Sequence, residues 1–514
     1  MRSGNVAAED ARARPCRTMI HADDHPAIAD APYGSQDLSV LAERAYSRTS
    51  GADAIRGNAV RLLIDARENY PAWLDAIRSA QRAILFEMYI VDDDEIGRTF
   101  ADALAERARA GVAVKVIVDW LGSWRGRSAW NALEGTGAEV RLFNAPGLAS
   151  PLAWLARDHR KTITVDDRIG FVSGLCVSEQ WVGKPAKRLE PWRDTGIAIQ
   201  GPAVAALQRA FAIVWDVAGE ALRPEYLTDP QSIAPAGDVT LRVVAGTPNS
   251  VGTYRLDLTI ASVAHQYLWL TDAYFVGTAA YVQALAAAAR DGVDVRLLVP
   301  GASDIPMISP VSRAAYKPLL DAGVRVFEWD GTMLHAKSAV ADGVWARVGS
   351  TNLNLASWMG NYELDVAIED RAFAQRMADQ YLTDLDRATE IVLTRRHRVR
   401  KTDDDGEESD ARRAPSGSAG RVAAGAVSVG SALSAALTNR RPLGAAEAGL
   451  LVKMGVLAIG LGAVAAFWPS FVAWPFAFIA SWMGLAWFVK AASLKRKAHE
   501  QAAQAGPPAG GGAN

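Results

Sequence analysis

The sequence predicts two similar α/β lobes related by a pseudo-twofold axis, followed by a helical hairpin in a membrane. Three observations support this fold class. A strand-helix-strand pattern occurs twice, an octet with the spacing His-x-Lys-x4-Asp follows each copy, and two long apolar runs stand near the end of the chain. Strands that alternate with helices form a sheet covered by helices, so each copy should fold as one α/β lobe.

The composition limits both the class of protein and its partners. The chain has 514 residues, of which 50% are hydrophobic, which is enough for two or three domains with sizeable cores. Its formal net charge is -2, so no global excess of positive charge attracts nucleic acid, and no nucleic-acid partner is expected. The two cysteines, Cys16 and Cys176, are far apart and have no metal-ligand spacing, which argues against a disulfide framework or a zinc site.

Shifts in composition along the chain set the expected domain boundaries. The first residues are polar and lack an apolar run, and a block of basic and then acidic residues separates the body from the apolar runs. The predicted order is a disordered arm at 1–40, a first lobe at 41–232, a second lobe at 233–395, a charged flexible linker at 396–445, a membrane hairpin at 446–492 and a disordered tail at 493–514.

The repeat accounts for the elements of the two lobes. The first copy reads AILFEMYIVDDDEIGRTFADALAERARAGVAVKVIVDW, a strand, a loop, an amphipathic helix from about Gly97 to Ala110, and a buried β-branched strand. The second copy reads YLWLTDAYFVGTAAYVQALAAAARDGVDVRLLVPG in the same order. Gly111 and Gly292 suit the C-terminal caps of the two helices, and LTDPQSIAPAGD at 227–238 is the expected joint.

The two apolar runs predict the membrane hairpin. They read GLLVKMGVLAIGLGAVAAFW and SFVAWPFAFIASWMGLAWFV, and each is close to the roughly 20 residues that span a bilayer. A buried hairpin of a soluble core is the alternative. Basic residues flank both outer ends, so the positive-inside rule predicts an inner-membrane protein whose two flanks and catalytic part are cytoplasmic. These residues are Arg440 and Arg441 on one side and Lys490, Lys495, Arg496 and Lys497 on the other.

The octets HRKTITVD, from His159, and HAKSAVAD, from His335, predict the site. Each reads as a strand with its histidine and lysine on one face. If the lobes face each other, both pairs converge on one cavity that suits a phosphoryl group, with no acidic cluster to hold a divalent metal. No metal or other cofactor is therefore expected. The remaining members of the predicted cluster are Lys161, Lys337, Ser178, Ser350 and Asn352.

The doubled octet, with Asp166 and Asp342 at its ends and GSTN at 349–352, resembles the duplicated signature of the phospholipase D superfamily. The wording is most similar to bacterial cardiolipin synthases, as in PWRDTGIAIQGPAV, MLHAKSAVADG and GSTNLNLASWMGNYELDVAI. One departure is SGLC after the first octet, which puts Cys176 where the family usually has asparagine. A small apolar filler and a reactive thiol are the two interpretations of that cysteine.

The resemblance implies a mechanism. A neutral imidazole attacks the phosphorus of a phospholipid to give a phosphohistidine, and the second, protonated histidine delivers a proton to the leaving alcohol. By similarity His159 is the nucleophile and His335 the acid, while Lys161 and Lys337 offset charge on the phosphoryl oxygens.

Each imidazole also needs an orienting carboxylate. The resemblance implies Asp194 in WRD and Glu363 in NYELD for this role, each taken to serve the histidine that precedes it in its own half of the chain. Asp166 and Asp342 are expected to make structural ion pairs. Two roles are possible for Glu87: it either faces the cavity or is a structural carboxylate.

The expected function is a phosphatidyltransferase acting on phospholipid phosphodiesters, with cardiolipin synthesis from phosphatidylglycerol as the leading form. A hydrolytic phospholipase D that releases phosphatidic acid is the alternative, followed by a nuclease. The expected partners are a phospholipid substrate and the membrane, and the oligomeric state stays open. Four tryptophans are candidates for an acyl-chain entrance, with core packing as the alternative: Trp120, Trp181, Trp192 and Trp358.

Overall fold

A computed structural model of the chain describes residues 35–146, 155–184, 186, 189–305, 308–393 and 399–401, with a few isolated positions between 456 and 485. The chain separates into two compact units, Met1–Ala45 and Tyr46–Asn514. The sheet, the cores and the candidate site all belong to the second unit. The first helix, α1, spans Ser35–Ser50.

The first lobe alternates strands and helices in the predicted order. Its helix α3 begins at Glu95, where the Asp94 side chain accepts a hydrogen bond from the Gly97 amide, and it ends at Arg109 before Gly111, which has a φ of 89°. The elements are β1 Ile55–Ile64, α2 Asp65–Arg78, β2 Ala83–Met88, α3 Glu95–Arg109, β3 Ala113–Asp119, α4 Arg127–Asn131, β4 Glu139–Phe143, β5 Lys161–Val165, β6 Ile169–Ser173, α5 Glu179–Val182, β7 Thr195–Gln200 and α6 Ala203–Val217.

The second lobe repeats this order after two short 3-10 turns: Pro224–Tyr226, which ends just before the expected joint at 227–238, and Pro230–Ser232, which lies within it. Its elements are β8 Val239–Gly246, α7 Gly252–Val263, β9 Tyr267–Thr271, α8 Ala279–Arg290, β10 Asp294–Pro300, α9 Ile308–Asp321, β11 Arg325–Trp329, β12 Ser338–Ala341, β13 Trp345–Gly349, α10 Leu355–Met359, β14 Glu363–Glu369, α11 Arg371–Leu385, β15 Ala388–Leu393 and β16 Val399–Lys401.

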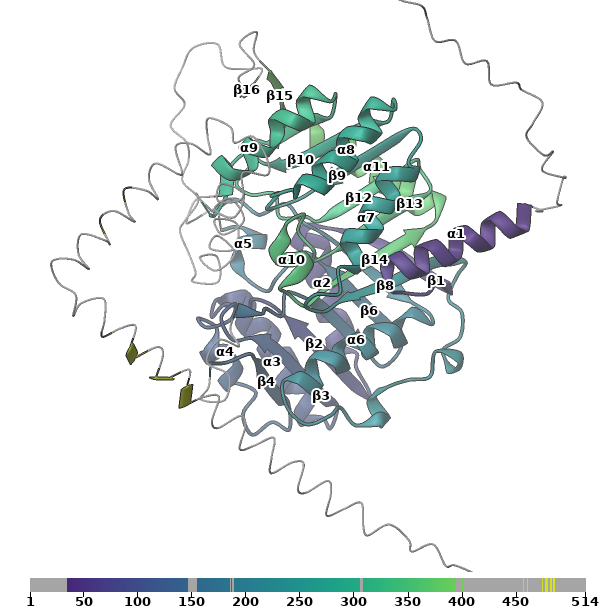
Figure 1. Cartoon of the computed structure of the whole chain (residues 1–514). Helices are drawn as coiled ribbons and strands as arrows, with labels where there is room; N and C mark the ends of the chain where they lie inside the picture. Colours follow the sequence, from purple (N-terminus) through teal and green to yellow (C-terminus); the bar gives the residue numbers. More distant parts are fainter. Residues whose placement is uncertain are drawn as a thin grey trace, which may run out of the picture. The chain divides into compact units, whose positions relative to one another are not determined.

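The strands form one continuous sheet whose order is symmetric about its centre (Figure 1). The order is β16-β15-β11-β10-β9-β12-β13-β14-β8-β1-β7-β6-β5-β2-β3-β4. Outward from the central antiparallel pair β1 and β8, the first lobe continues β7-β6-β5-β2-β3-β4 and the second β14-β13-β12-β9-β10-β11. The expectation of two similar α/β lobes is confirmed.

Helices cover both faces of the sheet, and the cores lie between the layers. In β2, Ile84 and Phe86 pack with Trp73 and Phe100 of α2 and α3, whereas Leu85 packs with residues of α6 on the opposite face. Side chains alternate between the faces of a strand, so burial of both faces explains why these strands read as unbroken apolar runs.

Two predicted segments are more ordered than the sequence suggested. Helix α1 begins at Ser35, inside the arm predicted to be disordered, and Val399–Lys401 of the predicted linker forms β16. Strand β16 pairs with β15, because β15 is otherwise a sheet edge with unpaired backbone groups. The predicted hairpin and tail lie almost wholly outside the described residues. Among the residues that are described, no helix is long and apolar enough to cross a membrane.

Candidate active site

The histidine of each octet lies just before a strand of its own lobe, and its backbone amide donates a hydrogen bond to the other lobe. The His159 amide donates to the Tyr362 carbonyl at 2.9 Å, and the His335 amide donates to the Arg193 carbonyl at 2.7 Å. Tyr362 directly precedes Glu363, as Arg193 precedes Asp194. These backbone pairings therefore bring each orienting carboxylate beside the histidine of the opposite lobe.

The two histidine–carboxylate dyads are crossed between the lobes. His159 Nδ1 lies 2.9 Å from Glu363 Oε2, and His335 Nδ1 lies 2.8 Å from Asp194 Oδ2. The expectation that each carboxylate serves the histidine before it in its own half is wrong, although the four residues are the predicted ones. The reason is that the backbone of each histidine pairs with the opposite lobe. The number of residues between a histidine and a carboxylate does not reveal this pairing.

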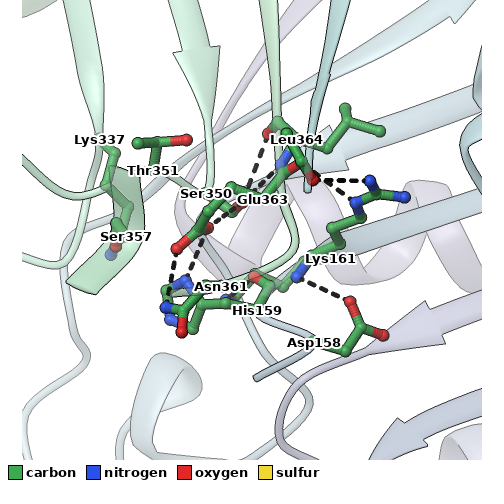
Figure 2. A network of polar contacts seen from close by, with 12 residues as sticks. Asp158, His159, Lys161, Lys337, Ser350, Thr351, Ser357, Asn361, Glu363 and Leu364 are labelled. Carbon is green, nitrogen blue, oxygen red and sulfur yellow. Dashed lines mark hydrogen bonds and ion pairs between the residues drawn. The ribbon is translucent and has the colours of Figure 1, made fainter. Parts of the chain in front are cut away.

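Further hydrogen bonds hold each carboxylate in place, and Figure 2 shows those of the dyad of His159 and Glu363. Glu363 Oε2 accepts from Ser350 Oγ at 2.6 Å, and its Oε1 accepts from Asn361 Nδ2 at 3.1 Å. Asp194 Oδ2 accepts from Trp181 Nε1 at 2.8 Å, and its Oδ1 accepts from the Thr195 amide at 2.8 Å. Carboxylates fixed in this way hold the histidine rings in one orientation and leave Nε2 of each ring as the nitrogen available for reaction.

The dyads differ because their carboxylates differ in length. Gly174 directly follows β6, and Ser350 directly follows β13, so Gly174 is the counterpart of Ser350 in the first lobe. A Cβ on Gly174 would lie 2.2 Å from Asp194 Oδ1, so only glycine leaves room for this carboxylate. Sequence reasoning grouped Ser350 with Ser178 as phosphate ligands, whereas the Ser350 hydroxyl donates to Glu363. Its role as a phosphate ligand stays a prediction.

Burial and charge set the protonation states of the dyads. Burial lowers the pKa of His159 to about 4 against the opposing charge of Glu363, and burial with Lys337 lowers the pKa of His335 to about 3. Burial alone would raise the pKa of Glu363 and of Asp194, but the charge and hydrogen bond of the partner histidine outweigh it and hold both below their usual range. In the free protein both imidazoles are neutral at pH 7 and both carboxylates are ionised.

The two lysines place the octets in one site. Lys161 and Lys337 each donate a hydrogen bond from Nζ to the carbonyl of the histidine two residues earlier, and Lys337 Nζ also lies 2.9 Å from His335 Nδ1. Both lysines are close enough to lower the pKa of both histidines. Burial lowers the pKa of Lys161 and brings that of Lys337 to about 8. The predicted convergence of the two His-Lys pairs is therefore supported by the geometry.

The three predicted phosphate donors lie in different surroundings. Asn352 is buried, and its Oδ1, an acceptor, has no hydrogen-bond partner within the described structure. The role of its Nδ2 group as a phosphate donor stays a prediction. Ser178 Oγ accepts from the Gln180 amide at 3.3 Å and caps α5, the role that Asn354 plays for α10. Ser178 thus corresponds to Asn354 rather than to Ser350.

Cys176 takes the place of Asn352 in the first lobe. It is fully buried in the core of that lobe, and burial raises the pKa of its thiol to about 11, so the thiol stays neutral. The interpretation as a small filler fits these surroundings better than a reactive thiol. The site consequently has an asparagine amide on one side and none at the matching position on the other.

The aspartates at the ends of the octets have a structural role with partners other than those expected. Asp166 accepts from the backbone amides of Gln81, Arg82 and Ala83 at 2.7 to 2.9 Å. Asp342 accepts from the amides of residues 265–267 at 2.7 to 2.8 Å. The expected ion pairs are wrong, because these carboxylates are satisfied by the unpaired amides at the starts of β2 and β9.

Aromatic residues beside the dyads were missed or left undecided by sequence reasoning. The Tyr89 ring lies edge-on to His159 at 4.7 Å, and Tyr274 lies edge-on to His335 at 5.8 Å. Trp181 and Trp192 pack against His335 at 5.3 and 5.6 Å and are almost fully buried. These two tryptophans therefore line the dyad of His335 and Asp194. The shared tyrosine in EMYIV and DAYFV was the available signal for the first pair.

The remaining candidates do not add reactive groups to the dyads. Glu87 is fully buried in β2 and accepts from Thr162 Oγ1 at 2.8 Å, which places it inside its own lobe. Within the described ranges, no group of three or more histidine, cysteine, aspartate or glutamate residues could hold a metal ion.

Comparison with known proteins gives the family. The family model described as cardiolipin synthase, PLD-like domain, matches residues 73–208 and 258–385. Cardiolipin synthase A of Pseudomonas syringae pv. syringae (strain B728a) is 32% identical over 73% of this chain and 78% of its own length. Cardiolipin synthase 2 of Bacillus anthracis is 33% identical over 66% of this chain and 67% of its own length.

Among solved structures, the phosphatidylserine synthase of Haemophilus influenzae Rd KW20 is similar in fold, with a TM-score of 0.52. It is 14% identical, and the match covers 68% of this chain and 91% of that protein. At this identity the likeness speaks for the fold alone.

Proposed function

The chain belongs to the phospholipase D-like cardiolipin synthase family, and from this membership and the crossed dyads we propose that it makes cardiolipin from two molecules of phosphatidylglycerol. The observation that carries the proposal is the pair of buried neutral histidines, each held by a carboxylate of the opposite lobe and each near both lysines. Such a pair supplies one nucleophile and one proton donor around a single phosphorus atom.

The first half-reaction breaks the bond between phosphorus and the glycerol oxygen. His159 Nε2 attacks phosphorus, a phosphorus–nitrogen bond forms, and the glycerol oxygen leaves with a proton from His335 Nε2. His159 is neutral and therefore nucleophilic at pH 7. The Asp194 carboxylate on Nδ1 favours protonated His335 once the anionic phosphodiester lies nearby, since the ring is flanked by negative charge on two sides.

The second half-reaction returns the enzyme to its starting state. The glycerol hydroxyl of a second phosphatidylglycerol attacks phosphorus, His335 takes its proton, and the bond to His159 breaks. Lys161 and Lys337 offset the charge on the phosphoryl oxygens in both steps, and the Nδ2 group of Asn352 would be a further donor. If water took the place of the second alcohol, the product would be phosphatidic acid.

The test of this function is to incubate the full chain in membranes with labelled phosphatidylglycerol and to separate the lipids, with and without excess chelator. Cardiolipin and free glycerol are the expected products in both samples. Phosphatidic acid without cardiolipin would indicate the hydrolase, and cleavage of DNA without lipid turnover would indicate a nuclease. Loss of turnover in chelator, restored by one divalent ion, would contradict the charge compensation assigned to the two lysines.

We also propose that the apolar runs between 446 and 492 form a membrane hairpin with both ends in the cytoplasm, and that the domain boundaries are those predicted above except at 35–40 and 399–401. The sequence supports this through the length of the runs and their basic flanks. The site would then face the cytoplasmic leaflet that contains its substrate.

Truncation after Lys401 should release the protein from membranes, because it removes the runs and keeps β16 paired with β15. Turnover of dispersed short-chain phosphatidylglycerol should persist, since all site residues precede the cut, while turnover in vesicles should fall. The measurement is extraction of membranes with salt and then with detergent. A truncated protein that still needs detergent, or a reporter at Asn514 found outside the cytoplasm, would contradict the hairpin.

A further inference from the structure

Arg193 joins the carboxylate of one lobe to the histidine strand of the other. It directly precedes Asp194 and is 6% exposed. Its amide donates to the Met333 carbonyl at 2.9 Å, and its carbonyl accepts from the His335 amide at 2.7 Å. The backbone of Arg193 thus fixes the chain that bears Asp194 against the chain that bears His335.

The Arg193 side chain strengthens the same junction. Its Nε and Nη2 donate to the two oxygens of Asp384 in α11 at 2.9 and 2.8 Å, and Asp384 is 5% exposed. Its Nη1 donates to Thr195 Oγ1 at 2.9 Å and to the Asp194 carbonyl. A bidentate guanidinium–carboxylate pair has a fixed geometry, so α11 of the second lobe holds the start of β7 in the first.

We propose that Arg193 is a positioning residue that acts through Asp194 on His335. This proposal rests on the proposed function, in which His335 must donate and accept a proton at Nε2. That role requires Asp194 Oδ2 to stay 2.8 Å from Nδ1, and a displacement of about 1 Å at a reacting group can cost about 100-fold in rate. The position before Glu363 is held by Tyr362, and the guanidinium that donates to the Glu363 carbonyl is that of Arg160, which follows His159.

Arg242 provides a matched control, because it is a buried arginine with a similar set of partners away from the dyads. It is fully buried, and its Nε donates to Glu369 at 2.8 Å. Its Nη1 donates to Ser47 Oγ at 2.9 Å and to the Ala52 carbonyl at 3.0 Å. A lysine at 242 should destabilise the fold as a lysine at 193 does, without moving Asp194.

The experiment compares two short-chain phosphatidyl substrates, one with glycerol and one with nitrophenol as the leaving alcohol, on the full chain. We expect R193K to lose about 100-fold in the single-turnover rate of leaving-group release on the glycerol substrate and much less on the nitrophenyl substrate, as H335A does. R242K should lower both rates by the same factor. D384N, which keeps the shape of the side chain and removes its charge, should follow R193K and serves if R193K does not fold.

Equal losses on both substrates for R193K and D384N, while H335A discriminates between them, would overturn the role assigned to Arg193. The ratio between the two substrates is measured whether the acceptor is an alcohol or water. A wild type that forms no cardiolipin therefore contradicts the proposed function without affecting the test of Arg193.

Discussion

His159→Ala should be inactive on every phosphodiester, with a loss on the order of 10⁶-fold, the loss seen when the covalent nucleophile of a protease is removed. A better leaving group cannot restore activity, because no bond to phosphorus forms without the imidazole. His335→Ala should lose about 10²- to 10⁴-fold on phosphatidylglycerol, the usual contribution of a general acid. Its rate of forming the phosphohistidine from the nitrophenyl substrate, seen as the first-turnover release of nitrophenol, should lie close to that of the wild type, since nitrophenolate leaves without a proton.

The measurement is the single-turnover rate of leaving-group release for both variants on both substrates, with R242K as the control for changes in folding. A rescue of His159→Ala by the nitrophenyl group, with His335→Ala inactive on both substrates, would reverse the roles of the two histidines. Near-wild-type rates for either variant on phosphatidylglycerol would contradict the two-histidine mechanism itself.

D194N and E363Q should each lower kcat by on the order of 10⁴-fold, as the equivalent change does in a catalytic triad. The reason is that an amide accepts poorly from Nδ1 and no longer favours the charged ring. The crossed dyads add a pattern to this loss. D194N should behave like His335→Ala and regain activity on the nitrophenyl substrate, whereas E363Q should behave like His159→Ala and regain none.

This pattern distinguishes the observed pairing from pairing within each half of the chain. If each carboxylate served the histidine of its own half, the nitrophenyl substrate would rescue E363Q instead of D194N. Ser350→Ala is the matched control, because it removes one hydrogen bond to Glu363 and keeps the carboxylate. Its loss should be much smaller than that of E363Q.

The sequence alone was sufficient to predict the two lobes and the four residues of the two dyads. The repeat could be found because each copy keeps the same order of strand, helix and capping glycine, and a symmetric strand order follows from it. The two His-Lys pairs could be found because each lies within one short stretch of chain next to a strand. Features set by a single element are visible in a single stretch of sequence.

Contacts between elements could not be predicted in the same way. The crossed dyads depend on backbone pairing of Tyr362 with Asp158 and of Arg193 with Leu334, pairs that are far apart in the chain. The amide partners of Asp166 likewise precede it by more than 80 residues. Spacing within one half gives no information on which half supplies the partner. The sequence therefore predicted the correct two carboxylates but assigned each of them to the wrong histidine.

The covalent intermediate tests the central claim most directly. The full-length His335→Ala variant would be mixed with the nitrophenyl substrate labelled with ³²P, denatured at alkaline pH within one turnover, and digested. We expect the label on the peptide that contains His159, released in step with one equivalent of nitrophenol. Label on the peptide that contains His335 in the His159→Ala variant, or no labelled peptide despite a burst of nitrophenol, would contradict the proposed mechanism.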